Sequence, residues 1–116
     1  MGSIVKAKCA CGFEKEFTLG GGYSGTDCNF PIYCVHCNIL FEGNVLDKNL
    51  ICPSCKTKDV LLYDNEQLCK KKGTEEVFDW NMEEEIGKIL ILTDGKYWCP
   101  ECKSFCLSFS DEGCWD

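Results

Sequence analysis

The stretch Trp98-Cys99-Pro100-Glu101-Cys102-Lys103 is the part of this 116-residue sequence that decides the fold class. Two cysteines separated by a tight turn direct their sulfur atoms into one small volume, which suits half of a four-cysteine metal site. The Cys-x-x-Cys pattern recurs in Ile51-Cys52-Pro53-Ser54-Cys55-Lys56 and in Tyr33-Cys34-Val35-His36-Cys37-Asn38, and Lys8-Cys9-Ala10-Cys11-Gly12 holds a shortened version. The sequence therefore offers four close pairs of cysteines.

Twelve cysteines in a chain of this length also raise the alternative of disulfide bonds or redox-active pairs. Disulfide-rich domains scatter their cysteines, whereas eight of the twelve lie in close pairs here. No thioredoxin-like βαβ pattern flanks any of the pairs. The spacing therefore favours two Zn²⁺ ions, with eight thiolates as ligands. In chain order, these ligands form the first to fourth pairs: Cys9/Cys11, Cys34/Cys37, Cys52/Cys55 and Cys99/Cys102.

The stretches 51–56 and 98–103 resemble the zinc knuckles of zinc-ribbon and rubredoxin-like proteins. Each has an apolar residue before a Cys-Pro-x-Cys turn and a predicted strand soon after it. After the second pair, Asn38 stands where many ribbons have glycine, and asparagine tolerates the left-handed conformation. This resemblance covers most of the chain as a repeated pattern. It implies a metal site and a ribbon fold, and it implies no particular function.

The whole chain also resembles a family of small prokaryotic cysteine-rich proteins to which no function is assigned. The matching features are Cys-x-Cys-Gly-Phe at 9–13, the glycine run at 20–22, the step Phe30-Pro31, the segment 92–100 and the terminal Trp115-Asp116. This second resemblance implies only the fold and the metal.

Alternating apolar residues predict a mainly β chain. Strands are expected at 4–8, 13–19, 60–63 and 105–109, and hairpins are expected to join 39–42 with 45–51 and 89–93 with 97–99. Weak helical signals occur at 65–72 and 82–86. We expect one domain over residues 1–116, a small metal-bound double zinc ribbon built from antiparallel hairpins. Its ribbon elements are 1–63 and 89–116, and an acidic insertion at 64–88 carries one or two short helices.

The division of the four pairs between two ions has two solutions. A hairpin over 38–51 returns the chain to its starting point with a short closure loop, which favours one ion shared by the second and third pairs. The first pair then shares the other ion with the fourth pair, and the chain ends meet. The alternative is sequential, with the first pair joined to the second and the third pair joined to the fourth.

Four cysteines and the single histidine lie outside this ligand set. Cys106 is expected to be a buried small apolar residue. Cys69 precedes three lysines, and nearby cations lower the pKa of a thiol, although an ordinary thiol is the simpler interpretation. Cys28 is an alternative ligand in place of Cys9 or Cys11. Cys114 is expected to pack locally, and His36 to be an exposed turn residue.

Acidic residues concentrate in the second half of the sequence. Residues 1–63 hold six lysines and six acids, whereas residues 64–116 hold six lysines and thirteen acids. The chain has no arginine, so it lacks the planar fork that binds phosphate or guanine in a bidentate manner. Nucleic-acid affinity rests on clustered cations, and this charge pattern argues against it. A solvated acidic surface is the simplest explanation of the acidic runs.

Catalysis finds little support in the sequence. A four-thiolate zinc site has no open position for water, and the glycine run at 20–22 lacks the lysine of a phosphate-binding loop. No apolar run is long enough to span a membrane, and the first residues lack the apolar core of a secretory signal. Phe78 and Trp80 are expected to complete the core, although exposed aromatic residues there would anchor a protein interface.

We therefore expect a non-catalytic, cytoplasmic zinc-binding module, monomeric by default, that acts as an adaptor for another protein. Three alternatives are compatible with the same sequence features. The first is a nucleic-acid or transcription-associated zinc ribbon, the second is a redox-sensing zinc-thiolate switch, and the third is an enzyme that uses Cys69.

Overall fold

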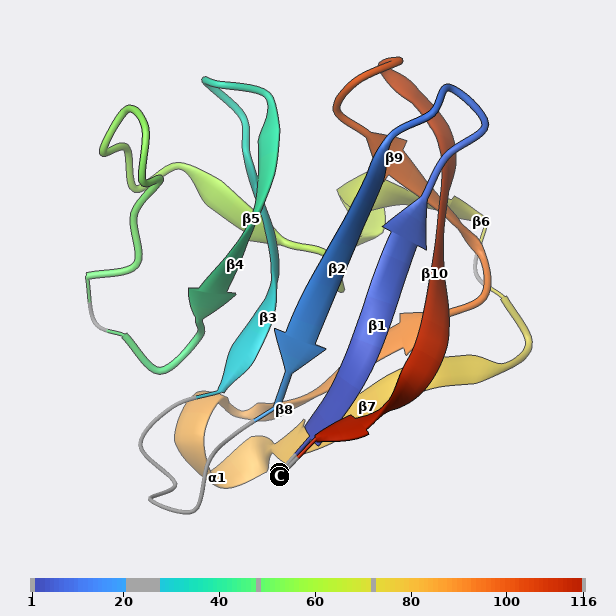
Figure 1. The fold of residues 1–116 in the computed structure, drawn as a ribbon. Coiled ribbons are helices and arrows are strands. Elements are labelled where there is room, and N and C mark those ends of the chain that lie inside the picture. The colour runs from blue at the N-terminus through green and yellow to red at the C-terminus, as the bar shows by residue number, and fades with distance from the viewer. Residues whose placement is uncertain (1, 21–27, 48, 72, 116) are drawn as a thin grey trace.

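The computed structural model describes residues 2–20, 28–47, 49–71 and 73–115, with only the backbone described at 71, 85, 114 and 115. Within these residues the chain is mainly β, and its strands pair antiparallel in three sheets (Figure 1). No helix among them is long and apolar enough to cross a membrane. The elements in chain order are β1 (Gly2–Lys8), β2 (Glu14–Leu19), β3 (Asn29–Cys34), β4 (Ile39–Asn44), β5 (Val60–Leu62), the 3-10 turn η1 (Glu66–Leu68), β6 (Cys69–Lys71), β7 (Glu76–Met82), α1 (Glu83–Ile86), β8 (Lys88–Thr93), β9 (Lys96–Cys99) and β10 (Ser104–Trp115).

The largest sheet has five strands in the order β2-β1-β10-β9-β6. The alternation of buried and exposed side chains expected in the strand at 13–19 is confirmed at the end of β2. Phe17 and Leu19 are buried there, while their neighbours on the strand are exposed. Strand β1 pairs with β10 from Gly2 opposite Trp115 onward, so the two ends of the chain lie side by side as expected. This sheet therefore brings the first cysteine pair next to the fourth.

The hairpin expected between 39–42 and 45–51 is wrong. Strand β4 pairs with β3 instead, within a three-stranded sheet of order β4-β3-β5. The side chain of Asn44 accepts hydrogen bonds from the backbone N–H groups of Cys28 and Leu46, at 2.9 and 3.0 Å, and thereby turns the chain away from the sheet. Gly43 serves packing rather than a turn, since a Cβ there would lie 2.6 Å from Cδ1 of Ile32.

The second expected hairpin is also wrong, although both of its strands exist. Strand β8 pairs with β7, and β9 pairs with β10 and β6. The Thr93 backbone N–H donates to the Tyr97 hydroxyl at 2.8 Å, and Gly73 N–H donates to the Thr93 hydroxyl at 3.0 Å. These bonds fix a corner between two sheets where the sequence pattern predicts a hairpin turn.

The helix predicted at 65–72 is limited to one 3-10 turn. The Asn65 side chain accepts from the Gln67 backbone N–H at 2.8 Å and caps the turn. Cys69 then adopts an extended conformation and pairs with Tyr97 of β9, because the sheet edge offers backbone partners there. The second helical signal corresponds to the single turn α1, which ends at the left-handed Gly87.

Aromatic rings form the centre of the core. Tyr63 is fully buried, and its ring centroid lies 6.4 Å from that of Tyr33, 6.2 Å from Tyr97 and 5.6 Å from Phe109. Phe78 is 3% exposed, so it is a core residue, as expected. The acidic segment therefore contributes to the core through β7.

Candidate metal centres

The second and third cysteine pairs meet in one group, which we call the first cluster: Cys34, Cys37, Cys52 and Cys55. Their four sulfur atoms all lie within 4.8 Å of one another. The Sγ–Sγ distance is 3.6 Å between Cys34 and Cys55 and 3.8 Å between Cys37 and Cys52. A tetrahedral site with Zn–S bonds of about 2.3 Å places its sulfur atoms about 3.8 Å apart. The residues present therefore fit a tetrahedral four-thiolate ion.

The first and fourth pairs meet in the second cluster, which we define by five residues: Cys9, Cys11, Cys99, Cys102 and Cys106. The sulfur atoms of Cys9, Cys99, Cys102 and Cys106 lie within 4.8 Å of one another. The Sγ–Sγ distances are 3.5 Å for Cys9 and Cys102, 3.7 Å for Cys11 and Cys99, and 3.0 Å for Cys102 and Cys106. All of these exceed the about 2.05 Å of a disulfide bond. This cluster thus contains five thiols, whereas a tetrahedral ion binds only four.

The three Cys-x-x-Cys turns share one backbone geometry. The residue after each turn has a positive φ, 56° at Asn38, 63° at Lys56 and 54° at Lys103. Its backbone N–H donates to the carbonyl of the first cysteine at 2.9–3.0 Å in each case. The left-handed conformation expected of Asn38 is confirmed. The sequence gives no such signal for the two lysines, because lysine does not favour this conformation.

The shortened first turn reaches a similar result with one residue fewer. Gly12 follows Cys11 with φ 103°, and its N–H donates to the carbonyl of Cys9 at 3.0 Å. Glycine adopts this conformation without the steric penalty of a side chain. The turns of the first and fourth pairs then lie side by side at one end of the molecule, while α1 lies at the other (Figure 1).

In the first cluster, hydrogen bonds favour one cysteine as a thiolate. Desolvation raises the pKa of Cys52, but hydrogen bonds from the backbone N–H groups of Cys55 and Ser54, together with those to the Cys34 and Cys55 side chains, outweigh it and lower the pKa to about 6. Burial raises the pKa of Cys34, and the hydrogen bond with Cys55 is the largest of the causes that raise the pKa of Cys37 to about 12.

In the second cluster, too, the pKa of one cysteine is lowered while the pKa values of others are raised. Hydrogen bonds from Cys106 and Ser104 lower the pKa of Cys102 to about 6. The Ser104 hydroxyl lies 3.1 Å from the Cys102 sulfur and 3.3 Å from the Cys106 sulfur. Burial raises the pKa of Cys9 and of Cys99. Each cluster therefore contains one cysteine whose pKa is lowered beside two whose pKa is raised.

A hydrogen-bonded bridge joins the two clusters. The Asn38 side chain, next to the first cluster, donates from Nδ2 to the carbonyl of Pro100 at 2.8 Å. Its Oδ1 accepts a hydrogen bond from the hydroxyl of Tyr33. The Tyr63 hydroxyl donates to the carbonyl of Trp98 at 2.9 Å. These hydrogen bonds thus fix the turn of the fourth pair against the part of the molecule that carries the second pair.

The cysteines outside the predicted ligand set have different positions. Cys28 is buried in the core, and neither group of clustered ligands among the described residues includes it. Cys69 is half-buried on β6 opposite Tyr97. Cys106 is half-buried at the second cluster, so the expectation of a buried apolar residue is wrong. The Cys114 side chain and the glycines at 21 and 22 lie outside the described part of the chain.

His36 is exposed, as expected of a turn residue. Its Nε2 lies 2.9 Å from a carboxylate oxygen of Asp59, and it belongs to neither cluster.

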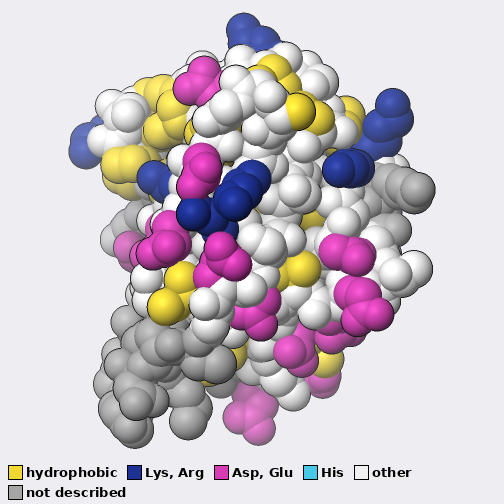
Figure 2. All heavy atoms as spheres, turned by 45° about the vertical axis from the view of Figure 1, so that its right-hand side comes forward, with side chains coloured by type: hydrophobic (Ala, Val, Ile, Leu, Met, Phe, Trp, Pro, Cys, Tyr) yellow, Lys and Arg dark blue, Asp and Glu magenta, His cyan; other side chains and the backbone are white. Residues whose placement is uncertain are grey.

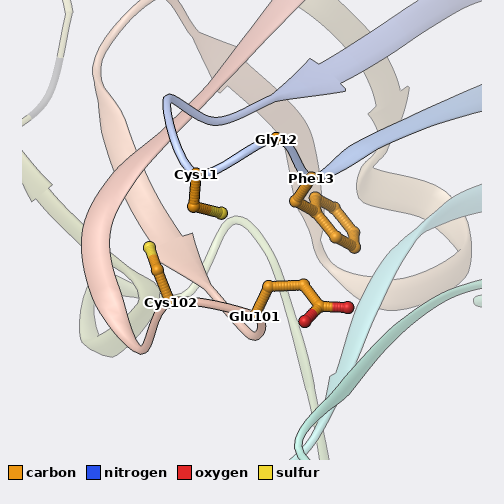
Figure 3. Close-up of a pocket in the computed structure, with 5 residues that line it drawn as sticks. All are labelled: Cys11, Gly12, Phe13, Glu101 and Cys102. Carbon is orange, nitrogen blue, oxygen red and sulfur yellow. The ribbon is translucent and has the colours of Figure 1, made fainter.

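The surface beside the second cluster is hollowed. Figure 3 shows the side chains of Cys11 and Cys102 extending toward the same space from two different turns. Gly12, Phe13 and Glu101 complete the lining. Cys11 and Cys102 are both exposed, so this cluster is accessible from solvent.

Comparison with known proteins adds no relative. The chain matches no family model, no curated protein and no solved structure.

Proposed function

We propose that this protein is a non-catalytic zinc-binding module of the double zinc-ribbon type that acts as a cytoplasmic adaptor for another protein. The observation that carries the metal assignment is the tetrahedral spacing of the clustered thiols. Tetrahedral sets of soft thiolates are typical of zinc and of iron–sulfur centres, and zinc is the ion that we propose for both clusters. Four thiolates leave no coordination position for water, which supports a structural rather than a catalytic ion.

In this proposal the first cluster holds one ion and four thiols of the second cluster hold the other. Bound zinc supplies folding free energy, because its ligands come from segments far apart in sequence. The chain's own residues supply the turns, the N–H donors and the Asn38 bridge that place the thiols. A reducing compartment keeps these thiols available for metal, which favours the cytoplasm.

The adaptor role rests on the distribution of charge. We call the part formed by β7 and α1 the acidic end; its exposed acids include Glu76, Asp79, Glu83 and Glu84. Figure 2 shows acidic side chains over the lower half of one face, while the visible lysines lie toward the upper half. Such a surface complements a partner with a basic segment. The same surface repels the phosphates of a nucleic acid.

Crosslinking in the native host, followed by mass spectrometry, tests this role. The variant Asp79→Asn/Glu84→Gln removes two charges from the acidic end, and Glu16→Gln/Glu66→Gln removes two exposed charges elsewhere. We expect a protein partner that crosslinks to the wild type and to the second variant but is depleted at least several-fold with the first. Both variants are expected to keep the zinc content of the wild type.

Equal recovery with both variants would contradict an adaptor that binds through the acidic end. Recovery of nucleic acid that is lost on adding salt would favour the transcription-associated alternative instead.

A redox-sensing switch is the second candidate, because Cys106 lies 3.0 Å from Cys102. The Cys102 thiolate and the Cys106 thiol would lose two electrons to hydrogen peroxide, and the products are one disulfide, one water and one hydroxide. Peroxide should then release zinc from the wild type and not from Cys106→Ser. Zinc release at the same rate from both proteins would exclude this disulfide as the switch.

A further inference from the structure

The second cluster differs from the first by one thiol. Cys9, Cys99 and Cys102 are common to two sets of four: the two predicted pairs, and the set whose sulfur atoms all lie within 4.8 Å of one another. The fourth position has two candidates, since Cys11 lies 3.7 Å from Cys99 and Cys106 lies 3.0 Å from Cys102. A tetrahedral ion accepts only one of them.

Each candidate has one geometric advantage. The distances of 3.5 Å for Cys9 and Cys102 and 3.7 Å for Cys11 and Cys99 match two opposite edges of a zinc tetrahedron, whose edges are about 3.8 Å. The first cluster shows the same pair of opposite edges, at 3.6 and 3.8 Å. Cys106, however, completes the set in which every sulfur lies within 4.8 Å of the others.

The two candidates also approach the cluster from different elements. Cys11 lies on the exposed turn between β1 and β2, and Cys106 lies half-buried on β10. Cys106 would need to move its sulfur by only about 0.8 Å to reach the tetrahedral distance from Cys102. A small side-chain adjustment can produce a shift of that size. The pairing of β10 with β9 is already irregular between Ser104 and Leu107, so the strand tolerates the adjustment.

We infer that Cys11 and Cys106 are interchangeable fourth ligands of a single ion at the second cluster. With zinc bound, the metal–sulfur bond to one residue would form as the bond to the other broke. The proton of the incoming thiol passes to the outgoing thiolate, so charge and oxidation state are unchanged. At any moment one of these two thiols would lie outside the coordination sphere, and Cys11 in that state would face the hollow that it lines with Cys102 (Figure 3).

This inference rests on the proposed zinc binding and is tested by the zinc content of four variants. Cys11→Ser and Cys106→Ser should each hold two ions per chain, whereas the double variant should hold one. Cys69→Ser, a half-buried cysteine outside both clusters, is the control and should hold two. Loss of an ion from one single variant alone would show a unique fourth ligand and overturn the inference. Two ions in the double variant would overturn it as well.

Alkylation of the wild-type protein provides a measurement that needs no substitution. Iodoacetamide labelling of the zinc-loaded and zinc-free proteins gives, by peptide mass mapping, how far zinc protects each thiol. We expect partial protection of both Cys11 and Cys106 and strong protection of Cys9. Complete protection of one candidate with none for the other would contradict exchange. If zinc binds to neither cluster of the wild type, the proposed function itself fails, which is a different result.

Discussion

The bridge between the clusters can be removed without changing the backbone at its centre. Replacing Asn38 by glycine keeps a residue that tolerates φ of 56° and deletes the bonds to Tyr33 and to the carbonyl of Pro100. Each intramolecular hydrogen bond contributes about 1 kcal/mol, so the loss should be about 2 kcal/mol. With an unfolding entropy of about 2.1 cal/mol/K per residue, that loss lowers the Tm by about 8 °C for a chain of this length.

The matched control is Lys56→Gly. Lys56 also follows a Cys-x-x-Cys turn with a left-handed φ of 63°, but its side chain makes only a 3.4 Å contact with the carbonyl of Pro53. Thermal unfolding would be followed by circular dichroism at a buffered free zinc concentration, because metal binding shifts the apparent stability. We expect the control to stay within about 2 °C of the wild type, or to gain stability from relief of strain.

An Asn38→Gly protein as stable as the wild type would refute the bridge as a source of stability. An equal loss in both variants would also refute it, since the effect would then come from glycine in the unfolded chain rather than from the two hydrogen bonds.

Two further predictions concern single contacts, and a third concerns removal of the metal. Tyr63→Phe removes the hydroxyl that donates to Trp98 and should lower the free energy of unfolding by about 1–2 kcal/mol in urea titration; no change would show that water replaces this bond. Gly43→Ala places a Cβ 2.6 Å from Ile32 and should cost about 1–3 kcal/mol in the same assay, whereas a neutral result would mean that the neighbouring side chain yields freely. An excess of a strong zinc chelator should abolish the near-ultraviolet circular dichroism of the buried aromatic residues, and a spectrum unchanged on chelation would contradict a structural role for the metal.

The sequence predicts correctly those local features that depend on only a few adjacent residues. The four cysteine pairs, the strands β1 and β2 and the left-handed Asn38 follow from short patterns, because turn geometry and alternation are local properties. The left-handed conformations of Lys56 and Lys103 are not predicted by the sequence, because the cysteine turns impose them and lysine itself does not favour them.

The main error of the sequence-based prediction lies in which strands pair with one another. The grouping of the second pair with the third was favoured on the basis of a hairpin over 38–51, and the structure brings these cysteines together without that hairpin. The partner of β4 is β3, which precedes the cysteine turn, and β5 completes the sheet from the other side. Such pairing depends on which strands bury the aromatic core, and no local pattern encodes it.

Cys106 was the missed member of the site. It lies two positions after Ser104, so on a strand both side chains share one face, and both contact the sulfur of Cys102. The alternation of a strand beginning at Ser104 was the signal that could have placed Cys106 near the fourth pair. The apolar residues that surround it favoured a core position instead.

Native mass spectrometry of protein isolated gently from its own host tests most directly whether the two clusters hold two zinc ions. We predict a native mass with two zinc ions and, after denaturation, a mass with all twelve thiols reduced. A metal-free native mass, together with a denatured mass lowered by the hydrogens lost to disulfide bonds, would contradict zinc binding by the two clusters.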